Sequence, residues 1–328
     1  MVSGKFPHNF HKLARIENDF TGLRPELKFN SAQKIWAVGG GKGGVGKSLV
    51  TANLAICLAL MGHKVIAIDL DLGGANLHTC LGIPIPDKTL SDYLSKKVKA
   101  LGELATPTPI QKLSIISGAQ DDLGIANLRM MQKNKILSHL SELDADYILF
   151  DLGAGTAFNT LDFFISSEKG ILTVLPEPTS IENTYRFIKS VYYRRLKMIE
   201  DLLDIGPLID QAMNAKLSDA DNTPTGLVKK VIEINPEMGM KLKAEIKKFV
   251  PKLIVNQVRT QADIDIGFSM KSICKRYFGI DLDYVGYLDY DATVWQSVKK
   301  RRPLLMEFPN SRLVTNFDKI VHKLLELN

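Results

Sequence analysis

The sequence predicts an α/β protein with a doubly wound, mostly parallel sheet and a helical insertion. From Lys34 onward, short apolar runs alternate with longer amphipathic ones, the pattern of buried parallel strands covered by helices on both faces. A glycine-rich loop joins the first apolar run to the first helical one. The stretch between residues 175 and 252 is much longer than one crossover helix requires, which predicts the insertion.

Composition excludes several classes of protein. With 328 residues, 45% hydrophobic and 24% charged, the chain is neither a mini-protein nor a disordered or fibrous one. The net charge of +6 permits an anionic partner without singling out nucleic acid or membrane. Cys57, Cys80 and Cys274 form no C-x-x-C pair, which argues against a disulfide framework or zinc ribbon and favours a reducing, cytoplasmic compartment. No apolar stretch approaches the roughly 20 residues of a membrane span.

The chain divides into an arm and one domain. Residues 1–33 are polar, mixed in charge and interrupted by glycine and proline, so we expect an N-terminal arm, and we expect the domain at 34–328. The first helix should begin near Lys47 and end before Gly62, which suits a left-handed cap. Strands are expected at Lys34–Gly39, Lys64–Asp69, Leu113–Ile116, Tyr147–Asp151, Ile171–Leu175, Lys252–Asn256 and Leu282–Leu288.

The predicted insertion covers about residues 202–248. It follows a basic helical run at 192–197 and contains a polar break at 218–225. Both features are typical of helices joined by a loop rather than of one continuous crossover helix.

A phosphate-binding motif follows the first predicted strand. The pattern G-x-x-x-x-G-K-[ST] begins right after an apolar run and opens a helix, which is the context that this motif requires. Its glycines let backbone N–H groups curl around phosphate oxygens, its lysine reaches the β and γ phosphates, and its serine hydroxyl ligates Mg²⁺. The sequence therefore predicts a P-loop NTPase that binds nucleotide through Gly41, Lys42, Gly43, Gly44, Val45, Gly46, Lys47 and Ser48.

Three carboxylates follow other strand candidates. Asp69 and Asp71 come at and after the end of the second predicted strand, and Asp151 ends the fourth. A D-x-D pair after a strand is more often a turn or a helix cap. These carboxylates, however, follow a phosphate-binding loop in the sequence. In such a chain, carboxylates at strand ends are expected in the crevice where open α/β sheets bind ligands.

Lys42 gives the motif a second lysine, in K-G-G-V-G-K-S. This form resembles the deviant Walker A sequence of the MinD/ParA family of ATPases. The resemblance implies that Lys42 crosses a dimer interface to the phosphates bound by the other subunit. It also implies roles for the D-x-D-x-x-x-x-N run: Asp69 supports the magnesium shell, Asp71 orients the attacking water, and Asn76 lies at the dimer interface.

Three further segments extend the resemblance. Asp151 with its glycine-bearing loop resembles a Walker B segment, which implies a carboxylate that holds Mg²⁺ through water. Asn256 ends another strand where the family has an adenine-binding asparagine. The run Leu175–Tyr185, L-P-E-P-T-S-I-E-N-T-Y, resembles the FlhG-type branch, which controls flagellar number. Around Leu288 the usual proline of the segment that closes over the base is replaced.

The resemblance implies a cytoplasmic switch with ATP and Mg²⁺ as cofactors, which hydrolyses ATP slowly and forms a homodimer when ATP is bound. It also implies a protein partner that stimulates hydrolysis, and in the FlhG-type branch this partner is flagellar. Such a switch positions or counts a cellular structure, and it can lie peripherally at the inner membrane. One alternative is a ParA-type partition ATPase that binds DNA non-specifically. A weaker one is an Mrp-type iron–sulfur carrier, which would need cluster-binding cysteines.

Two surface segments stay open at this stage. The run at 299–302 could touch DNA or acidic lipid, although such runs are more often solvated. The apolar positions between Leu313 and Leu325 have helical spacing. We expect that helix to pack in the core rather than lie on a membrane, because its polar face is not strongly basic.

Overall fold

The structure is a computed structural model that describes residues 33–72, 74–118, 128–214 and 223–327. The predicted N-terminal arm lies outside the described residues apart from Gln33, and so does most of the predicted polar break at 218–225. The division into an arm at 1–33 and one domain at 34–328 therefore stays a prediction.

Eight strands of the described chain form one sheet in the order β3-β4-β2-β5-β1-β6-β7-β8. All neighbours are parallel except β3 and β4, so the sheet is mostly parallel, as predicted. The strands are β1 (Lys34–Gly39), β2 (Val65–Leu70), β3 (Thr106–Pro107), β4 (Leu113–Ile116), β5 (Tyr147–Leu152), β6 (Lys169–Val174), β7 (Lys252–Val258) and β8 (Asp283–Asp289).

All seven predicted strands are confirmed, with ends within two residues of the expected ones. Buried parallel strands are continuous apolar runs, which is why they could be found. Strand β3 was not predicted. It has two residues, one of them a proline, so it carries no periodicity that a sequence pattern could reveal.

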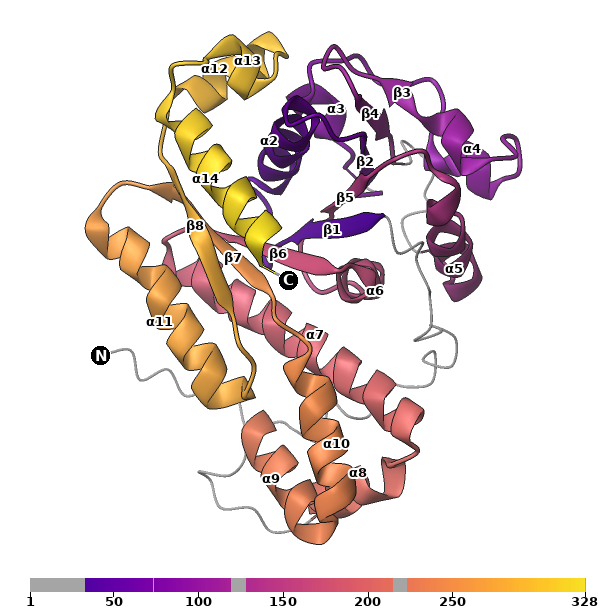
Figure 1. Cartoon of the computed structure of the whole chain (residues 1–328), viewed down its shortest axis with the longest axis vertical. Coiled ribbons are helices and arrows are strands. Elements are labelled where there is room, and N and C mark those ends of the chain that lie inside the picture. Colours follow the sequence, from indigo (N-terminus) through magenta and orange to yellow (C-terminus); the bar gives the residue numbers. More distant parts are fainter. Residues whose placement is uncertain (1–32, 73, 119–127, 215–222, 328) are drawn as a thin grey trace.

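Helices cover both faces of the sheet (Figure 1). Along β1, Trp36 and Val38 point into one core and Ile35 and Ala37 into the other, because successive side chains of a strand alternate. The first core is covered mainly by α2 (Lys47–Leu60) and α14 (Arg312–Glu326), and the second by α6 (Phe158–Ser166), α7 (Pro178–Leu203) and α11 (Gln261–Phe278).

Short helices complete the outer part of the fold. They are α3 (Leu77–Cys80), α4 (Leu90–Leu94), η1 (Leu101–Leu104), α5 (Met130–Ser138), η2 (Leu140–Glu142), α12 (Thr293–Lys300) and α13 (Leu304–Glu307). Helix α2 is followed by Gly62 at a φ of 99°, in the left-handed region. The predicted end of the first helix is therefore confirmed.

The described residues of the long connection between α7 and β7 form three helices. They are α8 (Gly206–Asn214), α9 (Pro224–Ile234) and α10 (Pro236–Lys247), and they gather beyond the far end of α7 (Figure 1). Thr223 caps α9 by accepting from the N–H of Gly226, and Asn235 caps α10 by accepting from that of Met238. The stretch is helical where the insertion was predicted.

The last helix, α14, belongs to the core. Leu313, Phe317, Ile320, Val321 and Leu324 are each at most 2% exposed and pack with α2 and the first core. The apolar face of α14 is thus used inside the fold, as predicted. No helix among the described residues is long and apolar enough to cross a bilayer.

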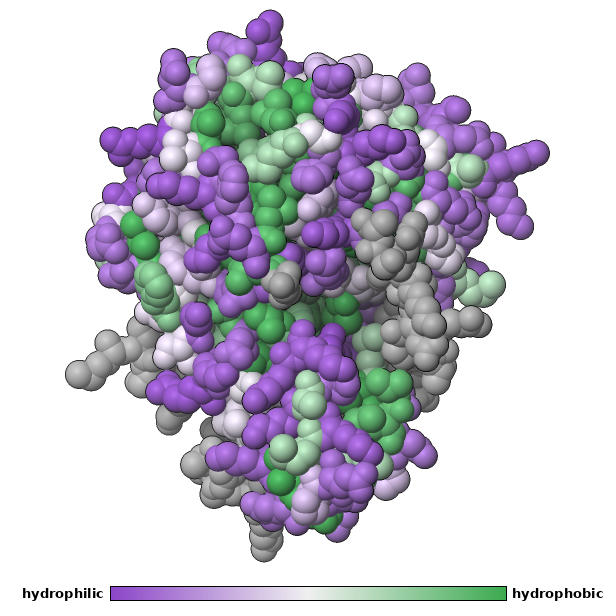
Figure 2. All heavy atoms as spheres, viewed as in Figure 1, coloured by the Kyte–Doolittle hydropathy of each residue, from purple (hydrophilic) through white to green (hydrophobic). Residues whose placement is uncertain are grey.

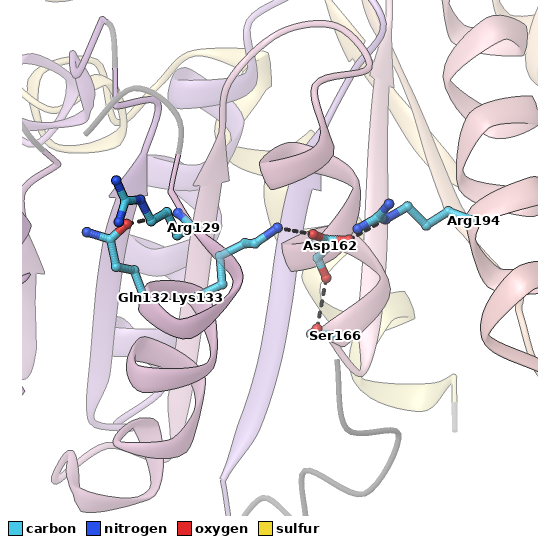
Figure 3. A network of polar contacts seen from close by, with 6 residues as sticks. All are labelled: Arg129, Gln132, Lys133, Asp162, Ser166 and Arg194. Carbon is cyan, nitrogen blue, oxygen red and sulfur yellow. Dashed lines mark hydrogen bonds and ion pairs between the residues drawn. The ribbon is translucent and has the colours of Figure 1, made fainter. Parts of the chain in front are cut away.

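A buried ion network joins three helices of the second layer. Asp162 of α6 is fully buried and accepts from Lys133 of α5 and from Arg194 of α7, both almost fully buried (Figure 3). The Arg194 guanidinium also lies 4.8 Å from the centre of the Phe158 ring. One carboxylate therefore offsets two cations in a region shielded from water.

We expect Asp162→Ala to lower the free energy of unfolding by about 3–5 kcal/mol, since the two buried cations lose this carboxylate. Urea unfolding monitored by circular dichroism measures the change. The matched control is Asp144→Ala, which removes an exposed carboxylate 2.7 Å from Lys64. That variant should unfold like the unchanged protein. Equal stability of all three proteins would contradict a structural role for the network.

Candidate nucleotide-binding site

The predicted phosphate loop lies at the carboxyl edge of the sheet, beside its central strand. Strand β1 pairs with β5 on one side and β6 on the other, and the chain order reverses there. Open α/β sheets bind ligands at such switch points, where the loops on either side diverge. Residues 40–46 join β1 to α2 in this place.

The loop has the backbone geometry of an anion cradle. Gly44 and Gly46 have φ angles of 77° and 94°, which favour glycine, and a Cβ added at Gly43 or Gly44 would meet open space. Helix α2 begins at Lys47 with no side-chain cap and no acidic residue in its first turn. The first backbone N–H groups of α2 and the positive end of its dipole therefore face the loop without a side-chain cap or a neighbouring acidic residue in the first turn, which favours a bound anion.

Two contacts fix the loop to distant parts of the chain. A Cβ at Gly41 would lie 2.0 Å from the carbonyl oxygen of Asn183 in α7, so only glycine fits there. Asn256, at the carboxyl end of β7, donates its amide to the carbonyl of Val45 at 2.9 Å. The same amide would lie 2.4 Å from a Cβ at Gly46. In this structure Asn256 therefore braces the loop, and the adenine contact predicted for it stays a prediction.

Asp69 and Asp151 lie side by side below the loop. They are partners in the register of β2 and β5, and both are at most 1% exposed. Asp69 accepts from the backbone N–H groups of Asp71 and Leu77 at 3.1 and 3.0 Å. One oxygen of Asp151 accepts from the Thr51 hydroxyl at 3.2 Å, whereas Oδ2 has no hydrogen-bond partner within the part of the chain that the structure describes.

Burial raises the pKa of both carboxyl groups, and for Asp151 the charge of Asp69 is the second cause. Hydrogen bonds from Leu77 and Asp71 partly lower the pKa of Asp69, and Ser48, Lys47 and Thr51 partly lower that of Asp151. Two buried carboxylates this close resist ionisation unless a cation joins them. That arrangement fits a metal better than it fits an isolated pair.

Asp71 and Asn76 lie in the segment that joins β2 to α3 at the carboxyl edge of the sheet. A Cβ at Gly153, in the loop after β5, would come 3.3 Å from Asp71 Oδ1, so the glycine allows Asp71 to approach that loop. Asn76 is exposed and donates to the carbonyl of Gly74 at 2.7 Å. Asp71 is therefore placed beside the carboxylate pair, and Asn76 faces outward.

Lys42 has partners within its own chain. Its Nζ lies 3.3 Å from Oε2 of Glu177 and 3.3 Å from Oγ1 of Thr179, at the start of α7. The side chains of Lys42 and Glu177 are 38% and 54% exposed, so the pair is weak and exchangeable.

Residues Ser48, Asp69 and Asp151 fit Mg²⁺ bound with a nucleotide. The orphaned, buried Oδ2 of Asp151 is the observation that tests the fit, because a buried carboxylate oxygen calls for a donor or a cation. Hydroxyl and carboxylate oxygens are the ligands Mg²⁺ prefers, and it commonly keeps water between itself and a carboxylate. The open cradle at Gly43 and Gly44 fits the phosphates.

Sequence reasoning missed two contributors to the site. Thr51 donates to Asp151, and its place one helical turn after Lys47 on α2 was the available signal. Glu177 was noted only inside a resembling segment, because nothing in the sequence pairs it with Lys42, 135 residues away.

The fold and the loop together define a P-loop nucleotide-binding α/β protein. Residues 36–304 match the family model described as "CobQ/CobB/MinD/ParA nucleotide binding domain". The chain belongs to this family of nucleotide-binding ATPases, and the predicted family is confirmed.

Relatives with assigned names include an antiactivator and a flagellum site-determining protein. The chain is 26% identical over 297 residues to the antiactivator FleN of Pseudomonas aeruginosa, covering 88% of this chain and 85% of that protein. It is 30% identical over 190 residues to the flagellum site-determining protein YlxH of Helicobacter pylori, covering 55% of this chain and 61% of YlxH.

Solved structures show the same fold. The septum site-determining protein MinD of Pyrococcus horikoshii, complexed with Mg-ADP, superposes with a TM-score of 0.59 at 22% identity, covering 90% of this chain and 97% of that one. MinD in the MinC:MinD complex of Aquifex aeolicus gives a TM-score of 0.56 at 18% identity, covering 90% and 96%. At these identities the likeness concerns the fold alone.

The raised carboxyl pKa values predict a pH dependence of stability. The pKa of Asp151 is about 8 in the folded chain, against about 4 for an unfolded aspartate. Between these values the folded state holds more protons than the unfolded state, so metal-free protein should lose stability as pH rises from 4 to 8. Asp151→Asn should reduce this loss.

Melting temperatures in EDTA, measured from pH 5 to pH 8 for both proteins, provide the test. Relative to the variant, the unchanged protein should become less stable at the higher pH. Parallel pH profiles would show that Asp151 does not titrate in this range.

Proposed function

We propose that the chain is an ATP-dependent dimerising switch that hydrolyses ATP slowly with Mg²⁺. The observation that carries the proposal is one loop with two lysines, Lys42 and Lys47, above the buried pair of Asp69 and Asp151. Lys47 would meet the β and γ phosphates from within its own subunit. Lys42, exposed at the rim, would reach the phosphates bound by a second copy.

The remaining residues would divide the chemistry among them. Ser48 would bind Mg²⁺ directly, and Asp69 and Asp151 through water, and the ion would neutralise charge on the phosphates. Asp71 would orient the attacking water and take up its proton. The loop amides from Gly41 to Gly46 would hold the phosphates, Asn256 would meet the adenine, and Asn76 would lie at the dimer interface.

We infer further that the switch positions or counts flagella. This proposal is supported by the similarity to the antiactivator FleN and to the flagellum site-determining protein YlxH. We propose a cytoplasmic protein whose hydrolysis is stimulated by a protein partner, which in that case would be flagellar. It could lie peripherally at the inner membrane.

Two other functions have less support. Plasmid partition proteins of Borrelia burgdorferi are among the similar structures, but at 15–16% identity they show the fold alone, so DNA partition stays a second candidate. For an iron–sulfur carrier, Cys57, Cys80 and Cys274 lie on three different helices, and burial raises the pKa of each thiol to about 12. That disposition does not favour a shared cluster.

The dimer and hydrolysis are tested by two variants. Asp71→Ala should still bind ATP and dimerise, because the loop, Lys47 and Ser48 remain, but its turnover should fall by 100-fold or more, on the order expected for loss of a general base. Lys42→Ala should bind ATP in part and stay monomeric, because the facing phosphates are less neutralised. Light scattering and phosphate release with ATP measure both. A monomeric Asp71→Ala, or a dimeric and active Lys42→Ala, would contradict the proposed mechanism.

The contact of Lys42 with Glu177 predicts a gain of function. The Lys42 ammonium must leave Glu177 before it can reach another subunit, so Glu177→Gln should tighten the ATP-bound dimer by about two- to fivefold, as expected for an exposed ion pair. Sedimentation equilibrium with a slowly hydrolysed ATP analogue measures the dissociation constant. Glu182→Gln, at the fifth residue of α7, is the control and should leave the dissociation constant unchanged. A weaker dimer in Glu177→Gln would mean that Glu177 acts across the interface instead.

A further inference from the structure

Helix α12 exposes apolar side chains that the fold leaves uncovered. Trp295 is 67% exposed and Val298 40%, and Met306 of the neighbouring α13 is 52% exposed. Near the top of the molecule, Figure 2 shows an apolar area just below α12 and α13, towards α2, with hydrophilic residues around it. A large aromatic ring held this far into water is unusual for a purely structural residue.

The same helix is strongly basic at its end. Residues 291–312 contain five Lys and Arg against two Asp and Glu. The two carboxylates are occupied: Asp291 accepts from Ser311 at 2.6 Å, and Glu307 pairs with Lys300 and Arg302 at 2.8 and 3.1 Å. Among the described residues Lys299 and Arg301 form no ion pair. We call Trp295, Val298, Lys299, Lys300, Arg301 and Arg302 the α12 patch.

The α12 patch is held rigidly. Arg301 closes the helix at a φ of 50°, and its carbonyl would lie 3.1 Å from a Cβ at Gly82. Pro303 would come still closer, at 2.7 Å from that Cβ, so the turn after α12 packs tightly on the loop after α3. Ser297, on the opposite side of α12, is buried. The exposed side chains are therefore presented by a fixed support rather than by a loose tail.

We propose that the α12 patch binds the surface of an anionic lipid bilayer. An indole ring has an apolar body and one N–H donor, which suits the boundary between headgroups and acyl chains. Val298 beside it can enter the same boundary, and cations on the flank meet acidic headgroups. Each cation near such a surface favours binding about fivefold. The α12 patch therefore supplies both contributions that a peripheral protein uses, apolar insertion and electrostatic attraction.

Nucleic acid fits the α12 patch less well. Phosphates would use the cations, but a stacked base needs a free aromatic face, and Lys299 Nζ already lies over the Trp295 ring at 4.8 Å from its centre. The exposed Val298 and Met306 also gain nothing from a phosphate backbone. An acyl boundary uses all of these side chains at once.

The inference deepens the peripheral membrane position proposed above by naming the surface responsible, and it does not depend on ATP-driven dimerisation. Helix α14 is the other segment that the sequence analysis considered for membrane binding, and its apolar face is buried in the core. Trp295 and Val298 of the α12 patch are exposed on the chain itself, and the proposal assigns no part in lipid binding to nucleotide. Binding can therefore be tested without ATP, and a failed dimerisation assay would leave the result intact.

The experiment is vesicle sedimentation with the full-length, nucleotide-free protein. Vesicles of equal parts phosphatidylcholine and phosphatidylglycerol, at 1 mM lipid and low salt, should carry most of the protein down, and pure phosphatidylcholine should not. Lys299→Gln with Arg301→Gln should weaken partitioning roughly 20- to 30-fold, about fivefold for each charge. Trp295→Ala should weaken it several-fold while the protein stays folded.

Matched controls lie on the helical insertion. Lys229→Gln with Lys247→Gln removes the same charge from two exposed lysines of α9 and α10, and Met240→Ala truncates a side chain that is 56% exposed. Both controls should bind like the unchanged protein. Because Trp36 is fully buried, a blue shift of tryptophan emission on binding, absent in Trp295→Ala, would place Trp295 in the boundary.

Three results would overturn the proposal. One is no binding to the anionic vesicles. Another is equal loss in the patch variants and the control variants, which would indicate general electrostatic attraction. The third is salt-sensitive binding to duplex DNA that requires Lys299 and Arg301, without any blue shift on vesicles, which would assign the α12 patch to nucleic acid instead.

Discussion

The pairing of Asp69 with Asp151 under a lysine-bearing loop is the constraint on which the site depends. The register of β2 and β5 places the two carboxylates side by side, and the surrounding core removes water from both. Such a pair costs free energy when ionised. The fold offsets that cost locally with backbone N–H groups, Thr51 and the nearby Lys47. Oδ2 of Asp151 has no hydrogen-bond partner among the described residues, and this is the position at which a bound cation would offset the rest of the cost.

Much of this could be predicted from the sequence, because the responsible signals are local. A buried parallel strand is an unbroken apolar run, and β1 and β5 each end at the residues that carry chemistry. The phosphate loop needs glycines at positions of positive φ, as at Gly44 and Gly46. The spacing of these glycines can therefore be recognised in the amino-acid sequence. Strand β3 shows the limit, since two residues, one of them a proline, leave no period to detect.

What could not be predicted are contacts between residues far apart in the chain. Asn256 reaches Val45 across 211 positions, and Asp162 meets Lys133 and Arg194 from three separate helices. Each of these residues is polar and unremarkable in its own segment, and only packing decides which partner it meets. The contact of Lys42 with Glu177 belongs to the same class. A motif can therefore identify a lysine without revealing which carboxylate of the chain it contacts.

The contrast between α14 and α12 shows why periodicity alone could not locate a surface for partners. Both helices have apolar residues at helical spacing, but the five apolar anchors of α14 are buried, whereas Trp295 and Val298 of α12 are exposed beside unpaired cations. Helix α12 is also connected to the nucleotide-binding site through α3. Asp69 accepts from the N–H of Leu77, at the start of α3, and Gly82, just beyond α3, packs against Pro303. The nucleotide-binding edge and the α12 patch thus share α3 as a common support, so a shift of α3 at one of them must be accommodated at the other.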